Sequence, residues 1–507
     1  MKKIFFIAGL FASITGLAQE PADALRYSWY TSSGTARQQS IGGAMASLGG
    51  DISATFVNPA GLGFYKTGDL VITPGFNFMN AKATYYGHKE KDNKSVFAFG
   101  TSGFVIGGAD RRNRSSAFAI AVNQTANFGS NLLYRGQQNQ SSYSQKYLEE
   151  INNKNDHSGN SVATNYPFGA SLAFNTFWID TIAGGTEGNF LFKSRAPLAT
   201  GLIQENIIET KGGITEIAIG GAGNYGDKWF VGATLAFPIL RYDRESSFTE
   251  ADATDDPNNK FDFATLNENL STKGGGINLK AGVIYKPVEY VRLGLAIHTP
   301  TFFQLTDEFS AEVITDTEGY MGRLNQNSDD LVGPGKFKYW HFTPYRIMLS
   351  GSYVIREIED VRKQKGFITA DIEFVNYKAS SYTTDPDYDD PQSDNYLETL
   401  NDVIDKVYKP AFNFKLGGEL KFTTIMARLG GAYYGNPYKD IAGEKGSRFQ
   451  ITGGLGYRNK GMFIDLSYVH NIGKDIHYAY RLQDGPYQGA NIKTSGGNVL
   501  VTLGFKI

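Results

Sequence analysis

The stretch 229-WFVGATLAFPI-239 decides the fold, because every second residue in it, beginning with Trp229, belongs to one unbroken apolar face. Successive side chains of a β-strand point to opposite faces, so a strand of this kind separates two solvents. Residues 368–374 repeat the pattern, with Thr369, Asp371 and Glu373 opposite an apolar face. In a soluble sandwich the apolar faces would meet protein, whereas in a membrane barrel they would meet lipid and the charges would line a lumen. The apolar face of the first stretch consists of Trp229, Val231, Ala233, Leu235, Phe237 and Ile239.

The lengths of the connections favour the barrel. After each even-numbered strand the connection is short, and the intervening ones are longer, notably 127–202, 250–265, 307–335 and 380–406. Short periplasmic turns alternating with long external loops are typical of outer-membrane barrels, as is an even strand number. The sequence therefore predicts an all-β fold, a 14-stranded antiparallel transmembrane β-barrel over residues 69–507. The strands are expected to begin near Asp69, Asn93, Asn113, Gln204, Lys228, Leu266, Tyr290, Phe337, Gly366, Tyr408, Thr424, Ser447, Gly461 and Ile492.

The N-terminus indicates export. Residues 1–18 are interpreted as a signal peptide, with Lys2-Lys3 followed by an apolar run that ends in small residues. No later segment is long and uncharged enough for a transmembrane helix. We therefore expect an outer-membrane location, with both termini periplasmic and the wall in contact with lipid and lipopolysaccharide.

The composition excludes several classes of function. The chain has 507 residues, a net charge of −2 and no Cys. Near-neutral charge gives no reason to expect a nucleic-acid partner, and the absence of Cys excludes disulfides and thiolate metal sites. The 59 Gly residues exceed the usual share of about 7%. Glycines inside strands suit tight curvature and the close approach of a plug.

Residues 19–68 precede the barrel and do not alternate. They are rich in Gly, Ala and Ser, and they end with Asn58-Pro59-Ala60-Gly61, whose Asn-Pro and Gly pin a turn. About fifty residues are enough to fold inside a fourteen-strand lumen and obstruct it. We interpret the segment as an N-terminal hatch, or plug.

At this point the chain resembles the FadL family of outer-membrane channels for hydrophobic compounds. The resemblance rests on Gly50-Asp51, on Asn58-Pro59-Ala60-Gly61 ahead of the first strand, on the strand number, and on Ile297-His298-Thr299-Pro300-Thr301. It implies that Asn58, Pro59, Ala60 and Gly61 belong to a ligand-responsive hatch inside the barrel. It also implies that ligand binds in an apolar pocket, that the hatch shifts, and that cargo leaves laterally through a strand kink. A passive plug anchored by the same turn is the alternative.

The final strand also resembles a known signal. Val499, Val501, Leu503, Phe505 and Ile507 alternate to the last residue. An apolar, aromatic last strand resembles the signal by which outer-membrane barrels are recognised for insertion, with Ile507 in place of the more usual Phe.

If the apolar faces point outward, a set of charged side chains points into the lumen. Charges of both signs facing a lumen usually pair across strands or hold a plug, and a polar substrate path is the alternative. Two carboxylates on one face, Asp371 and Glu373, lie roughly 7 Å apart, yet no sequence signal selects them for catalysis. We expect no enzyme activity and assign no catalytic residue. The lumen-facing set is Arg292, His298, Arg346, Asp371, Glu373, Lys415, Glu419, Arg428 and Asp465.

Three motifs are interpreted as accidental. Gly221, Gly223 and Gly226 match a dinucleotide fingerprint, but another strand follows them instead of a helix. The acidic loop 385–390 imitates a calcium loop but lacks its sixth-position Gly and twelfth-position Glu. The six His residues show no metal-ligand spacing. We therefore expect no metal and no cofactor.

The external loops carry two expected helices, over 144–152 and 396–407, and one apolar segment, 168–182. Three readings remain open for that segment: packing between loops, an entry groove for a hydrophobic ligand, or a docking patch for protein partners. The candidate groove residues are Phe174, Phe177 and Trp178.

Together with the barrel architecture, the resemblance to the FadL family implies passive uptake of hydrophobic small molecules, of a fatty-acid or aromatic-hydrocarbon kind. Affinity would come from apolar burial at roughly 25 cal/mol per Å², and the drive from a concentration gradient. The alternative is a structural or shuttle barrel in an outer-membrane protein secretion or assembly complex.

Overall fold

The structure is a computed structural model that describes residues 21–29, 33–109, 114–254, 256–355, 365–387, 391–439 and 446–507. Within these ranges no helix is long and apolar enough to cross a membrane. The helices are α2 (Pro21–Ser28), α3 (Ala36–Ser40), α4 (Ala54–Val57), η1 (Pro59–Phe64), α5 (Ser144–Asn153), α6 (Gly159–Thr164), α7 (Ala170–Asn175), α8 (Ser328–Val332), η3 (Tyr377–Ala379) and α9 (Pro391–Val407).

The remaining elements are β1 (Asp69–Ile72), β2 (Pro74–Tyr85), β3 (His88–Phe99), β4 (Ser102–Ala109), β5 (Ser115–Asn127), β6 (Ser130–Gln138), β7 (Ile179–Thr181), β8 (Phe192–Ser194), β9 (Leu202–Tyr225), β10 (Trp229–Asp252), β11 (Phe263–Val288), β12 (Val291–His298), β13 (Phe302–Asp316), β14 (Arg323–Asn327), β15 (Gly335–Phe342), β16 (Arg346–Ile355), β17 (Gly366–Asn376), β18 (Ser381–Thr384), β19 (Pro410–Phe422), β20 (Ile425–Tyr434), β21 (Arg448–Asn459), β22 (Met462–His477) and β23 (Ala490–Lys506).

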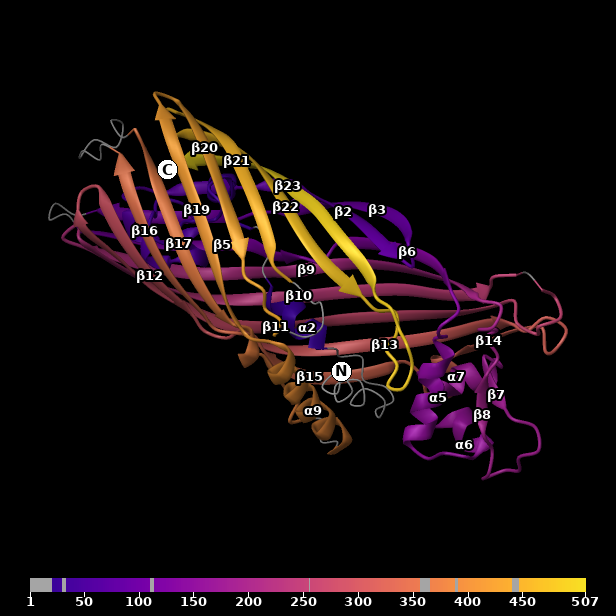
Figure 1. Ribbon diagram of the computed structural model, residues 1–507. Helices are drawn as coiled ribbons and strands as arrows, with labels where there is room; N and C mark the ends of the chain where they lie inside the picture. Colours follow the sequence, from indigo (N-terminus) through magenta and orange to yellow (C-terminus); the bar gives the residue numbers. More distant parts are fainter. Residues whose placement is uncertain are drawn as a thin grey trace.

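The strands form a closed antiparallel barrel of fourteen wall strands, which confirms the predicted fold (Figure 1). Six wall strands consist of two consecutive elements each: β1–β2, β3–β4, β5–β6, β12–β13, β15–β16 and β17–β18. Closure comes from β23, which pairs with both β1 and β2. Two hairpin elements, β7 and β8, form a separate small sheet.

An apolar belt surrounds the barrel, and its outer limit is visible along β10. The outward side chains from Trp229 to Ile239 are apolar and about half exposed, whereas the next two outward positions are Arg241 and Asp243. At the opposite limit, next to the short turns, exposed aromatic rings pair; Trp229 stacks on Tyr285 with ring centroids 4.3 Å apart. An apolar band flanked by aromatic residues is the pattern of a barrel wall that faces lipid.

The strands β9, β10 and β11 continue far past this belt. Their 24, 24 and 26 residues exceed the 9–11 residues that a tilted strand needs to cross a bilayer. Figure 1 shows the projecting ends next to a group of small helices and strands. We call that group the loop domain; it comprises residues 139–201, with α5, α6, α7, β7 and β8.

The predicted strand starts agree with the structure to within three residues, except for the second wall strand. It begins at His88 and not near Asn93, because β2 and β3 are joined by the tight turn Tyr86-Gly87, with φ of 43° and 85°. A second correction concerns the expected loop 127–202. Its first part is strand β6, so the loop begins only after Gln138. The expected loops 307–335 and 380–406 also contain strand residues, namely the end of β13 with β14 and the short strand β18. These errors lie where the chain has passed the apolar belt and alternation no longer marks a strand.

Candidate functional site

The described part of the predicted hatch, residues 19–68, consists of residues 21–29 and 33–68. We keep the name hatch for residues 33–68, which lie in the lumen and are joined by the carboxylate of Asp51. Thr35 Oγ1 donates to both oxygens of Asp51 at 3.0 Å, and the Ser53 N–H donates to the same group at 2.9 Å. Thr35 also caps α3 by accepting from the Gln38 N–H. Buried polar groups need partners, so Asp51 fixes the relative positions of the start and the middle of the hatch.

The motif Asn58-Pro59-Ala60-Gly61 forms the turn that ends the hatch. Asn58 Oδ1 accepts from the Ala60 N–H at 3.1 Å, and its Nδ2 donates to the Ala46 carbonyl at 2.6 Å. Gly61 lies so close to Gly49 that an added Cβ would stand 2.9 Å from the Gly49 Cα. The four residues therefore clamp two parts of the hatch.

Glycines in the wall let the hatch backbone approach closely. A Cβ at Gly232 would lie 2.5 Å from the Pro59 carbonyl carbon, and Cβ atoms at Gly417 and Gly430 would collide with the Ile41 backbone. Glycine in a strand is expected where another backbone comes near. These contacts explain part of the high glycine content. We call the wall surface formed by these glycines, which fits the hatch backbone, the hatch bed.

The nine predicted lumen charges all lie on the inner face, and most of them contact the hatch or each other. Glu373 accepts from Arg346 Nη1 at 3.0 Å and from Lys415 Nζ at 2.7 Å. Arg428 donates to Glu419 at 2.7 Å and to Asp465 at 2.6 Å, with no exposed side-chain surface of its own. The first cluster joins the neighbouring strands β16, β17 and β19, and the second extends from β19 to β22, crossing β21 at Gly456.

The remaining predicted charges bind the hatch backbone. Asp371 accepts from the Met45 N–H at 2.9 Å and from the Ala46 N–H at 3.1 Å. Arg292 donates to the Leu48 carbonyl at 2.6 Å, and His298 Nε2 lies 2.9 Å from the Val57 carbonyl. Asp371 and Glu373, side by side on one face, thus serve different partners.

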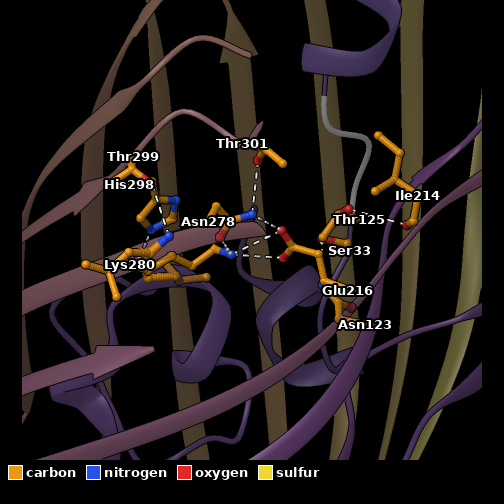
Figure 2. A network of polar contacts seen from close by, with 12 residues as sticks. Ser33, Asn123, Thr125, Ile214, Glu216, Asn278, Lys280, His298, Thr299 and Thr301 are labelled. Carbon is orange, nitrogen blue, oxygen red and sulfur yellow. Dashed lines mark hydrogen bonds and ion pairs between the residues drawn. The ribbon is translucent and has the colours of Figure 1, made fainter. Parts of the chain in front are cut away.

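Sequence reasoning missed a further buried pair, Glu216 and Lys280. Lys280 Nζ lies 3.0 and 3.1 Å from the two Glu216 oxygens, and Asn278 Nδ2 donates to Glu216 at 2.9 Å (Figure 2). The same inward parity that selected the other charges would have identified both residues. The pair adjoins a cavity of about 90 Å³ whose lining includes Phe56 and Glu373. Apolar and polar side chains both line that cavity, and the ion pairs of Glu216 and Glu373 form part of its wall.

A packed cluster rich in aromatic side chains, called the aromatic chamber, lies towards the loops and surrounds α2. Ala24, Leu25 and Tyr27 of α2 are at most 4% exposed. Tyr408 Oη donates to the Pro21 carbonyl at 2.8 Å, and Arg346 bonds the Ser28 carbonyl. Side chains of α9 also pack against the cluster. The chamber wall consists of Leu240, Tyr242, Phe303, Phe337, Tyr339, His341 and Tyr382.

The wall itself is interrupted between the second and third wall strands. Below the break, β4 pairs with β5 as far as Ser102 and Val122. Above it, within the described residues, β3 pairs with β2 and β6 pairs with β9, and β3 and β6 are not paired with each other. A bulge between Gln124 and Ala126 marks the start of the break.

A wall recess of about 380 Å³ lies at this break. Phe97 and Ile239, which line it, are 59% and 53% exposed on the outer face. From β3, Lys94 reaches past the gap to Glu209 of β9, with Nζ 2.7 Å from Oε1. The recess is lined by Val96, Phe97, Gln124, Asn127, Gly129, Lys211, Gly212, Gly213, Thr215, Ile239 and Arg241.

The three candidate groove residues lie in the packed loop domain. Trp178 is fully buried, and its indole N–H donates to Glu250 at 2.8 Å. Phe174 packs against Phe192, and Phe177 against Tyr320. Trp178 in this position is a core residue of the loop domain and does not line an open groove, in keeping with the loop-packing reading.

The described residues contain no cluster of three or more His, Asp or Glu able to hold a metal ion. Part of the acidic loop that imitates a calcium site, residues 388–390, lies outside the described residues. The glycines 221–226 belong to the end of β9 and the turn to β10, so they open no helix.

Neither the models of known protein families nor the curated proteins compared with this chain give a match. Solved structures do. A Pseudomonas aeruginosa FadL homologue is 12% identical, with a TM-score of 0.54 over 94% of this chain and 99% of that chain. The P. putida toluene transporter TodX is 12% identical, with a TM-score of 0.52 over 94% of this chain and 99% of that chain. The chain therefore has the FadL-type barrel fold, as the strand number and the hatch motif predict.

Proposed function

We propose that the protein is an outer-membrane channel for passive uptake of hydrophobic small molecules. The observation that carries the proposal is the wall recess. It joins an exposed apolar surface to the unpaired edge of two wall strands, at the level where the apolar belt ends. Open sheet edges do not occur within the hydrocarbon region. Among the described residues, β3 and β6 are unpaired with each other only past the apolar belt, so the recess lies at the boundary where strand pairing stops. Lateral release into the membrane at this break accounts for both features.

The lumen supports the same reading in two further ways. The aromatic chamber provides an apolar binding compartment near the external loops. The hatch lies across the lumen and is bound to the wall by hydrogen bonds from Asp371 and Arg292. In the proposed route a hydrophobic molecule enters from the loops, is stopped by the hatch and leaves sideways through the wall recess. The named relatives, a FadL homologue and a toluene transporter, are consistent with such a route.

A reversible lock of the recess tests the proposal. A Cβ at Gly129 would stand 2.8 Å from Val96 Cγ1, and the chain contains no Cys. The double variant Val96→Cys, Gly129→Cys should therefore form a disulfide across the break. The matched control pairs Ala427→Cys with Leu455→Cys, opposite each other on two intact wall strands. Radiolabelled toluene uptake should be lost when the first pair is oxidised and recover after reduction, while the control transports in both states.

Two results would contradict the proposal in different ways. Uptake that continues with an oxidised Val96–Gly129 pair would remove the lateral route. Absence of toluene and oleate uptake by the unmodified protein would remove the transport function itself. Purification from the native membrane, followed by mass spectrometry, addresses the alternative: stoichiometric outer-membrane proteins without bound ligand would identify a subunit of a larger machine.

A further inference from the structure

The aromatic chamber is built around a phenol ring supplied by the protein itself. Tyr27 of α2 is 1% exposed. Its ring lies edge-on to His341 at 5.9 Å and to Tyr242 at 6.3 Å, and tilted against Phe128 at 6.1 Å. Edge-on contacts at such distances are favourable for aromatic rings. The chamber thus already accommodates a phenol on three sides.

Two polar atoms of the chamber have no hydrogen-bond partner among the described residues: His341 Nε2 and Tyr382 Oη. Both side chains are at most 1% exposed, and their rings lie 4.5 Å apart. His341 Nδ1 faces the Ser381 carbonyl at 3.2 Å, and a carbonyl only accepts. Nδ1 therefore carries the proton of the neutral ring, which leaves Nε2 as a buried acceptor. Buried polar atoms are normally paired, so this acceptor favours a ligand that brings a donor.

We propose that the aromatic chamber binds small phenolic compounds, and that α2 is its built-in occupant, with Tyr27 in the place of the ligand's ring. The inference rests on the proposed function, because a ligand reaches the chamber only if the protein admits hydrophobic molecules. The phenol hydroxyl donates to His341 Nε2 and the aromatic wall holds the ring. Binding displaces α2, whose contacts to the wall include ring packing, the Arg26 guanidinium over the Tyr242 ring and bonds to its terminal carbonyls.

The test uses p-cresol, which is the free side chain of tyrosine, and toluene, which lacks the hydroxyl. Both are titrated calorimetrically into the full-length protein in detergent, as wild type, Tyr27→Ala and Tyr27→Ala with His341→Phe. We expect Tyr27→Ala to bind p-cresol more tightly than wild type, because the internal competitor is gone. Replacing His341 by Phe should lower the ratio of p-cresol to toluene affinity roughly three- to tenfold, the range of one net hydrogen bond. Equal p-cresol affinity in wild type and Tyr27→Ala, or an unchanged ratio after His341→Phe, would overturn the proposal.

A second measurement keeps the proposal testable if Tyr27→Ala does not fold. Ala24 of α2 is 1% exposed, and Ala24→Cys introduces the sole thiol into an otherwise native chain. We expect p-cresol to accelerate maleimide labelling of this thiol more than toluene does at equal thermodynamic activity. Labelling that p-cresol leaves unchanged would show that α2 is not displaced and would reject the site. Toluene uptake in vesicles separates the two failures: if it persists, only the phenolic site is wrong, and if it is absent, the proposed function is wrong.

Discussion

The two compartments of the lumen are held in different ways. The hatch is bound to the wall by hydrogen bonds from charged side chains to its backbone and by glycine contacts that admit one backbone shape. In the aromatic chamber α2 is held largely by ring packing. Directional bonds between buried groups specify one arrangement, because an unmade bond is costly. Apolar packing is non-directional, so a ligand of suitable shape can replace it. The comparison identifies the hatch bed as the fixed part and α2 as the exchangeable part.

The strongest test of the fixed part introduces a side chain into the hatch bed. Gly454 of β21 faces the hatch, where a Cβ would collide with Ser40, whereas a Cβ at the adjacent Gly453 would have nothing nearer than 3.7 Å. Gly454→Val should displace the hatch and convert a closed barrel into an ion-conducting one in planar bilayers. Overpacking of this kind costs about 1–3 kcal/mol or more. Gly453→Val is the control, and its barrel should stay closed to ions. Equal conductance of the two variants would contradict the claim that the hatch bed fixes the position of the hatch.

A large effect on stability is expected from the buried cluster of Arg428, Glu419 and Asp465. Arg428→Met removes the cation between the two carboxylates, of which Glu419 keeps Arg37 at 3.6 Å, and should lower the free energy of unfolding by about 3–5 kcal/mol. Guanidinium titration in phospholipid vesicles measures the change. Lys336→Met is the control, because its partner Glu308 and Lys336 itself are more than half exposed, and such pairs contribute about 0–1 kcal/mol. Similar losses in both variants would show that burial does not decide the strength of these pairs.

A smaller effect is expected for the exchangeable part. Tyr408→Phe removes the hydrogen bond to the Pro21 carbonyl, which contributes about 0.5–1.5 kcal/mol. In an Ala24→Cys background, maleimide labelling of α2 should become roughly three- to tenfold faster while the melting temperature of the barrel is unchanged. The conservative change Tyr382→Phe, at a hydroxyl without a partner among the described residues, should leave the labelling rate unchanged. A fall in barrel stability with Tyr408→Phe would indicate that α2 is structural.

The last prediction concerns helix α5 of the loop domain, which lies outside the lumen. Burial raises the pKa of Glu150 in α5 from 4.5 to about 7, although its carboxylate accepts from the Ala170 N–H. Folding therefore favours the protonated form, so the packing of α5 on α7 should be most stable below about pH 4.5 and weaken as the pH rises to 7. Hydrogen exchange of α5, corrected for intrinsic rates, should be faster at pH 8 than at pH 5. Glu150→Gln should remove the difference, and exchange in α3 should show none.

Strand direction and face could be predicted from the sequence because alternation is a local property. The parity that places Trp229 outward also places Arg428 and Asp465 inward, and the structure agrees. The pairing of Arg428 with Asp465 could not be predicted from the sequence. The two residues are 37 positions apart, and they meet only because of the register of the strands that carry them. For Asp371 the partner is the hatch backbone, more than three hundred residues away in the sequence. No pattern within either segment contains that information.

The break in the wall was not predicted for a related reason. The upper parts of β3 and β6 lie beyond the apolar belt, and residues 88–94 are polar on both faces. Alternation arises from the contrast between lipid and lumen, so it disappears where both sides are polar. Trp178 shows the same limit of sequence-based prediction in the loop domain. The sequence of an apolar segment is the same whether the segment lines a groove or packs in a core. Glu250, which fixes Trp178, lies 72 residues further along the chain.

The closure of the barrel involves the hatch. Residue Ile507 and the end of the hatch are joined by two reciprocal hydrogen bonds, Gly68 N to Ile507 O and Ile507 N to Gly68 O, each 2.9 Å. The closing strand β23 also binds the hatch through Thr502, whose Oγ1 accepts from the Ala36 N–H. These contacts form only when β23 is in place, so closing the ring and seating the hatch are energetically coupled.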